Sequence, residues 1–177
     1  NSSAASDVYK RQENKRLYTI YIKNWKDPIS GIIESSSNYW VLIKRIPNDY
    51  ILDGFAFIQK CHIESYKRTE EDRFKEKILI AKGIMDIPVP EFSISNRLDL
   101  LNRLNALQCV VEIQTDLESS FFIGKLEEVK TSIFRWKSMD NRGKWENDLR
   151  QLRVRDIVSI NVNTDYVTSL VAYNQSL

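Results

Sequence analysis

The sequence contains few of the residues that build metal sites or covalent cross-links. One of its 177 residues is a histidine, His62, which excludes a metal site made of several histidines. The two cysteines, Cys61 and Cys109, are too few and too badly spaced for a disulfide framework or a zinc site. We therefore expect no bound metal, and we expect both cysteines to be small buried side chains in a reducing compartment.

Long apolar runs are also missing. No segment approaches the ~18 consecutive apolar residues that a membrane-spanning helix needs. The chain does not open with a short apolar segment between a basic flank and a small-residue cleavage site, which is the pattern of a secretory signal. These two absences predict a cytoplasmic protein that does not contact a membrane.

The usual catalytic and cofactor motifs are absent too. The sequence has no phosphate loop, dinucleotide fingerprint, metal-ligand spacing or nucleophile elbow. The acidic runs at 70–72 and 127–128 are better explained by a helix start and a loop, and His62 by an ordinary polar role at a strand end. We therefore expect a protein that is not an enzyme and that takes no cofactor.

Overall composition predicts a globular protein. The hydrophobic share of 42% and the charged share of 28% are ordinary for a folded domain. The formal net charge of +2 is too small to indicate a polyanionic partner by itself. The stretch from Glu13 to Arg68 has nine Lys and Arg against six Asp and Glu, whereas the part from Cys109 onward has nine against ten, so a nucleic-acid surface would be expected in the first stretch.

The positive feature of the sequence is a strand-rich unit that occurs twice. The matching segments are 17–20 with 110–113, 29–33 with 122–126, 40–44 with 133–137, and 63–66 with 157–160. Gly31 and Gly124 occupy the same position in the two copies. An internal repeat of this kind predicts two small domains built on one plan.

The chain is accordingly divided into four parts. Residues 1–16 are set aside as a non-native or disordered segment, because 1–12 have no hydrophobic period and resemble a sequencing artefact. Strands are expected within 17–68 and 109–177, including an extra C-terminal strand at 166–173. Between them, 69–108 is expected to be a helical linker, with Thr69 and Ser95 as N-caps and Gly83 ending the first helix.

Short, bent strands in so few residues are expected to curl into small barrels, with Gly31 and Gly124 at the sharp bends. The pattern in 17–68 and 109–163 resembles the Sm-like barrel of the bacterial Hfq and Sm/LSm families. The resulting fold prediction is mainly β with two linking helices, arranged as two five- to six-stranded Sm-like barrels in tandem.

That resemblance implies RNA binding by loops. Asn38 stands where Sm proteins have a loop Asn, and Lys60 and His62 stand near the Lys-His pair of Hfq, with Cys61 between them. From the residues alone, Lys23, Trp25 and Lys26 are candidates for a surface that stacks bases and contacts phosphates. Packing of Trp25 between the two domains is the favoured alternative.

Two functional hypotheses follow. The Asp that Sm proteins place in the same loop is absent from both copies, and the second copy has no histidine, so a non-catalytic binding or adaptor protein with a protein partner is favoured. It would take a peptide, or a second copy of itself, at an open strand edge. The alternative is RNA or single-stranded nucleic-acid binding through the first unit.

Overall fold

The computed structural model describes residues 15–177, so the prediction for residues 1–16 lies outside the described part except for Lys15 and Arg16. The strands are β1 (Leu17–Ile22), β2 (Ile29–Ser36), β3 (Trp40–Arg45), β4 (Phe55–Gln59), β5 (Ile63–Lys67), β6 (Val111–Thr115), β7 (Phe121–Val129), β8 (Ile133–Met139), β9 (Trp145–Arg153) and β10 (Ile157–Val162). The helices are α2 (Glu70–Ala81), α3 (Arg97–Leu107) and α4 (Asp165–Gln175), with 3-10 turns η1 (Lys60–His62), η2 (Ile84–Asp86) and η3 (Val154–Asp156).

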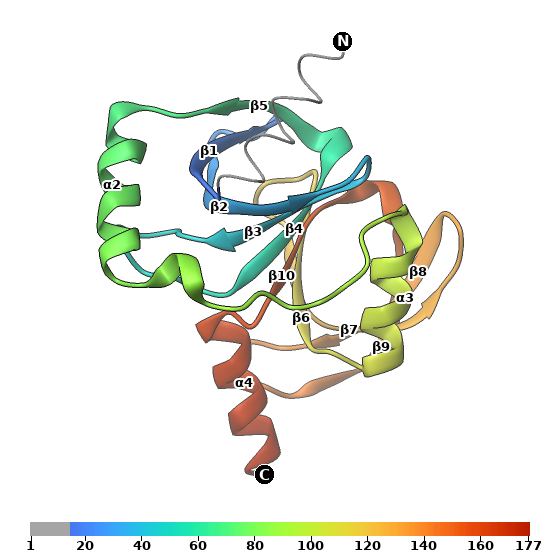
Figure 1. Ribbon diagram of the computed structural model, residues 1–177. Helices are drawn as coiled ribbons and strands as arrows, with labels where there is room; N and C mark the ends of the chain where they lie inside the picture. Colours follow the sequence, from blue (N-terminus) through green and yellow to red (C-terminus); the bar gives the residue numbers. More distant parts are fainter. Residues whose placement is uncertain (1–14) are drawn as a thin grey trace.

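All ten strands belong to one antiparallel sheet, in the order β5-β1-β2-β3-β4-β10-β6-β7-β8-β9 (Figure 1). The prediction of two closed barrels is therefore wrong, because β4 pairs with β10 and joins the two groups of strands directly. Every residue of β4 and of β10 is buried, as expected for central strands that are covered on both faces. Hereafter β1–β5 with α2 form the first half, and β6–β10 with α4 form the second half.

The strand order is the same within each half. Gly31 lies opposite Tyr18 and Arg45, and Gly124 lies opposite Val111 and Ser138. A Cβ atom at Gly31 would lie 2.7 Å from the carbonyl oxygen of Lys44, and one at Gly124 would overlap the carbonyl oxygen of Lys137. Both glycines are thus required by close strand approach. One β-bulge in β2 and one in β7 add local bends to the open sheet.

The largest core cluster spans both halves. Its buried members come from β3, β4, α3, η3 and the strands of the second half: Trp40, Leu42, Phe55, Phe57, Leu100, Leu101, Leu104, Val111, Ile113, Leu126, Phe134, Trp136, Val154, Ile157, Ile160 and Val162. Helix α3, which lies in the predicted linker, is part of this core, and the indole Nε1 of Trp40 donates to the carbonyl oxygen of Arg97 at 3.2 Å. Each buried leucine of α3 contributes about 1.5–3 kcal/mol by leaving water.

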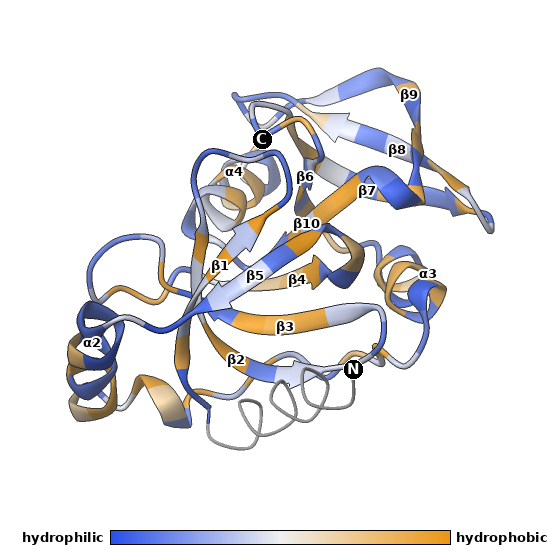
Figure 2. Ribbon diagram, turned by 90° about the horizontal axis from the view of Figure 1, so that it is seen from above, coloured by the Kyte–Doolittle hydropathy of each residue, from blue (hydrophilic) through white to orange (hydrophobic). Residues whose placement is uncertain are grey.

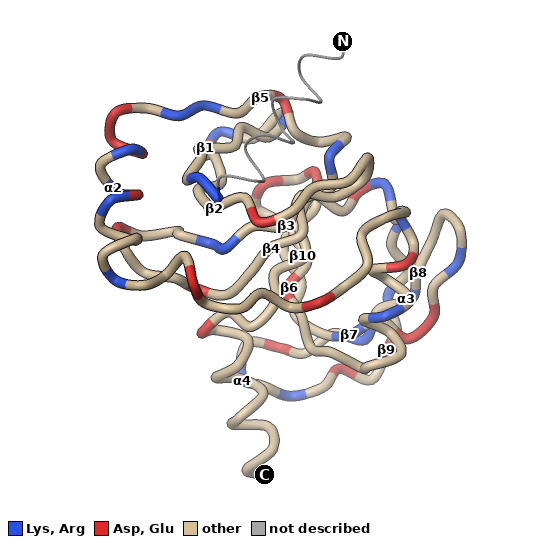
Figure 3. The backbone as a smooth tube through the Cα atoms, in the orientation of Figure 1, with Lys and Arg blue, Asp and Glu red and all other residues tan. Residues whose placement is uncertain are grey.

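Two of the three predicted helix-capping residues are confirmed. Thr69 caps α2 in a capping box with Asp72, as predicted, and Gly83 follows the helix with a left-handed φ of 75°. Asn96 caps α3 in place of the predicted Ser95. Figure 3 shows charges of both signs on α2.

The predicted extra strand at 166–173 is wrong, because this segment forms α4. It cannot pair with the strand that precedes it, since β10 already pairs with β4 on one side and β6 on the other. The hydroxyl of Thr164 accepts a hydrogen bond from the backbone N–H of Val167 and so favours a helix start. No helix within residues 15–177 is long and apolar enough to span a membrane.

Side chains also tie the halves together. The Gln59 amide donates to the carbonyl oxygens of Val154 at 3.1 Å and Ile157 at 2.6 Å. Asp53 Oδ1 accepts a hydrogen bond from the backbone N–H of Asp165 at 2.7 Å. These contacts supplement the β4–β10 ladder, so the halves share one folded body.

Candidate binding site at the outer edge of the sheet

The structure brings two of the predicted nucleic-acid contacts together at the end of β1. The backbone N–H of Lys23 donates to the carbonyl oxygen of His62 at 2.9 Å, and its Nζ donates to that of Cys61 at 2.9 Å. The His62 ring donates from Nε2 to the carbonyl oxygen of Arg155, in the second half, at 2.6 Å. Lys23 Nζ and His62 Nε2 therefore both donate hydrogen bonds to carbonyl oxygens of the same chain.

A second pair of predicted residues lies at the β2–β3 loop. Lys60 Nζ donates to the carbonyl oxygen of Ser37 at 3.0 Å, and burial lowers the pKa of this lysine. Asn38, the next residue of that loop, is exposed. Its predicted role in binding nucleic acid stays a prediction.

Trp25 and Lys26 lie in the turn after β1, against the second half. Trp25 packs on the core cluster of the first half and lines a cavity of about 310 Å³ that also touches Gln114, Glu118 and Asn161. Backbone N–H groups of Lys26 and Asp27 each donate to the Glu118 carboxylate at 2.8 Å, and they hold the pKa of Glu118 below its usual value. Base stacking by Trp25 and its packing between the halves both stay predictions.

The second half presents a long free strand at the end of the sheet. Within residues 15–177, β9 pairs only with β8, and residues 147–151 are exposed without interruption. Figure 2 shows β9 as the outermost strand of this half. An edge strand directs alternate N–H and C=O groups outward, where they can pair with another chain. The opposite edge, β5, has 5 residues against 9 in β9.

A cavity of about 200 Å³ lies beside β9 and is called here the β9 cavity. Its floor is apolar, and its rim is polar except for Leu117. The floor consists of Ile113, Phe122, Phe134, Leu152 and Ile157, and the rim consists of Thr115, Asp116, Leu117, Ser120, Arg153 and Asp156. Leu152 and Arg153 belong to β9 itself, so the cavity adjoins the free edge. An apolar lining with a few polar groups is typical of ligand pockets.

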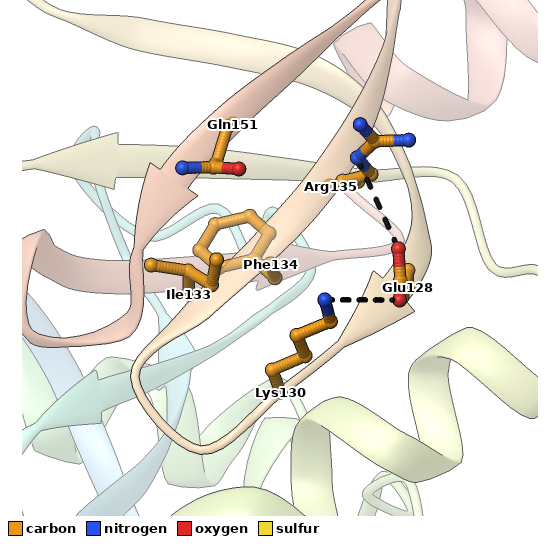
Figure 4. A pocket seen from close by; sticks show the side chains of 6 residues that line it. All are labelled: Glu128, Lys130, Ile133, Phe134, Arg135 and Gln151. Atoms are coloured by element: carbon orange, nitrogen blue, oxygen red, sulfur yellow. Dashed lines mark ion pairs between the residues drawn. The ribbon is translucent and has the colours of Figure 1, made fainter.

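A smaller hollow lies around the turn between β7 and β8. Figure 4 shows Glu128 between Lys130 and Arg135, with ion-pair distances of 3.6 Å and 3.9 Å. The hollow measures about 10 Å³, which is room for roughly one water molecule. We therefore assign no ligand to it.

Sequence reasoning missed the edge strand as a site. It expected a peptide at an open strand edge but did not assign that edge to β9, Trp145–Arg153. The mixture of Glu146, Asp148, Arg150 and Arg153 along 145–153 is the signal that could have identified it, because charged side chains are typical of edge strands. No cluster of three or more His, Cys, Asp or Glu that could hold a metal ion occurs in the described residues.

Comparisons with known proteins give no assignment, since no family model, no curated protein and no solved structure matches this chain.

Proposed function

We propose that this chain is a non-catalytic binding protein that takes up a strand of a protein partner along β9. The observation that carries the proposal is the nine-residue length of β9 combined with its free outer edge. Strand addition supplies backbone hydrogen bonds, each contributing about 0.5–1.5 kcal/mol net. A bound strand would continue the antiparallel sheet.

The side chains of β9 support selective binding. Glu146 is paired with Arg150 at 3.7 Å and Arg153 with Asp156 at 2.8 Å, which leaves the Asp148 carboxylate without an ionic partner among residues 15–177. Like charges placed opposite one another in a sheet are unfavourable, so a partner strand with a basic residue opposite Asp148 is preferred. The same charges discourage indiscriminate pairing of exposed edges.

Cytoplasmic location is part of the same proposal. Cys61 is exposed and Cys109 is half-buried, so the prediction that both are buried is wrong, and both are free thiols. Free, partly accessible thiols are common in reducing compartments.

Proline substitution in β9 tests strand addition. Successive residues direct their backbone groups to opposite edges, so one of Leu149→Pro and Arg150→Pro removes an outward N–H and the other removes one that faces β8. The substitution that removes the outward N–H breaks no hydrogen bond to β8, so it is identified as the variant that keeps the wild-type thermal midpoint of unfolding. We expect it to bind peptides selected from a phage-displayed heptapeptide library about tenfold more weakly than wild type.

Ser65→Pro in β5 is the matched control at the other edge, and it should leave peptide affinity unchanged. Amide hydrogen exchange should also slow in β9 when the peptide is bound. The proposal is overturned if no peptide is selected, or if the selected peptides bind both β9 variants as tightly as wild type.

Single-stranded nucleic acid bound by the first half is the second candidate. Exposed Asn38 and Tyr39 lie next to Ser37, whose carbonyl oxygen accepts from Lys60 Nζ, and Arg97 lies over the Tyr39 ring at 5.9 Å. An exposed ring beside cationic groups suits base stacking and phosphate contact. Binding of a labelled oligonucleotide that weakens steeply with salt, in place of peptide binding, would favour this candidate.

A further inference from the structure

We propose that the β9 cavity receives a bulky apolar side chain of the added strand, next to a basic residue of the same partner. This inference rests on the proposed strand addition and specifies the chemistry of the partner. It assigns the occupant as an extended peptide segment that carries Phe, Leu, Ile or Trp beside Lys or Arg.

The register of the sheet determines which partner residue would face the cavity. Phe134 of β8 lies opposite Leu152 of β9, and both side chains line the cavity floor. Directly opposed residues of neighbouring strands lie on the same face of a sheet. A partner residue opposite Leu152 therefore directs its side chain to the face that holds the cavity.

The floor is already part of the protein interior. Ile113, Phe134 and Ile157 are buried members of the largest core cluster, and Phe122 and Leu152 pack against it. An apolar side chain placed there leaves water for a preformed apolar surface, which is favourable without rearrangement of the core. The cavity volume of about 200 Å³ suits one large side chain, whereas it is small for an independent cofactor.

The rim sets the charge preference. The Asp156 carboxylate is paired with Arg153, at 2.8 Å. The Asp116 carboxylate is exposed and makes no hydrogen bond or ion pair with residues 15–177. The unmatched charge at the rim is therefore negative, which favours a cationic neighbour of the inserted side chain. Leu117, with 66% of its surface exposed, extends the apolar surface at this rim.

Filling the cavity with a bulky side chain introduced at its rim tests the inference. Ser120 lies in the β6–β7 loop and lines the cavity, whereas its neighbour Ser119 is exposed and does not line it. The probe is the most frequently selected heptapeptide, labelled with fluorescein and measured by anisotropy on the full chain. We expect Ser120→Trp to weaken binding about tenfold and Ser119→Trp to change it less than about twofold.

The peptide supplies an independent arm that does not depend on how a variant folds. Replacing its large apolar residue by Ala should weaken binding about tenfold, and replacing its basic residue by Glu should also weaken binding. Selected peptides that lack a large apolar residue, or that bind Ser120→Trp as tightly as wild type, would overturn the cavity assignment. If the peptides slow amide exchange in β9 but do not need a large apolar residue, strand addition is retained and only the cavity assignment is lost. Failure to select any peptide would end both proposals.

Discussion

Replacing Lys44 by Met should destabilise the protein by about 3–5 kcal/mol, the range measured when one partner of a buried ion pair is removed. The Lys44 side chain is fully buried, and its Nζ lies 2.7 Å from Glu34 Oε1. It also donates to the carbonyl oxygen of Met85 at 2.9 Å. Without Lys44, the Glu34 carboxylate keeps only Lys15, at 3.7 Å, as an ionic partner among the described residues.

The double variant Lys44→Met/Glu34→Leu separates the loss of the pair from the burial of a lone charge. It should recover a large part of the lost stability, because replacing a buried pair by apolar side chains is often nearly neutral. Urea unfolding followed by tryptophan fluorescence gives the three free energies. A Lys44→Met variant that loses less than about 1 kcal/mol would show that Glu34 is not held as a buried charge.

Gly54→Ala should destabilise the protein by about 3 kcal/mol. Gly54 has a φ of 68°, and a Cβ atom there would lie 2.5 Å from the carbonyl oxygen of Val162 and 2.7 Å from the backbone N of Thr164. Left-handed backbone costs an alanine about 1–2 kcal/mol, and steric overlap with packed groups adds about 1–3 kcal/mol. Both neighbouring residues belong to the second half, so the overlap falls at the contact between halves.

Gly83→Ala is the matched control for this substitution. Gly83 has a φ of 75°, but no atom lies within 4 Å of the position its Cβ would take. This variant should therefore lose only the cost of the left-handed backbone, about 1–2 kcal/mol. Equal losses in the two variants, measured by urea unfolding, would show that Gly54 does not approach the second half closely.

Local sequence predicted most of the individual elements. The repeated segments 17–20 and 122–126 lie within β1 and β7, and the Thr69 capping pattern indicated the start of α2. These features depend on neighbouring residues, which is why a single sequence reveals them. Descent of the two halves from one duplicated unit stays a prediction.

The pairing of β4 with β10 could not be predicted in the same way. Residues 55–59 and 157–162 both have the composition of buried strands, but that composition does not tell which strand pairs with which. The β9 cavity depends on strand pairing within the second half, because its lining comes from β6, β7, β8, β9, β10 and the loop and turn beside them. The Lys44–Glu34 pair likewise depends on the packing around it, which the local pattern does not contain.

The central claim is one continuous sheet with a free edge at β9. Residue-resolved amide hydrogen exchange by NMR tests both parts in one experiment. The account predicts that amides of β4 and β10 exchange as slowly as those of β3, while outward amides of β9 exchange rapidly. Amides of β10 that exchange as fast as those of β9 would contradict it, because the two halves would then not share a sheet.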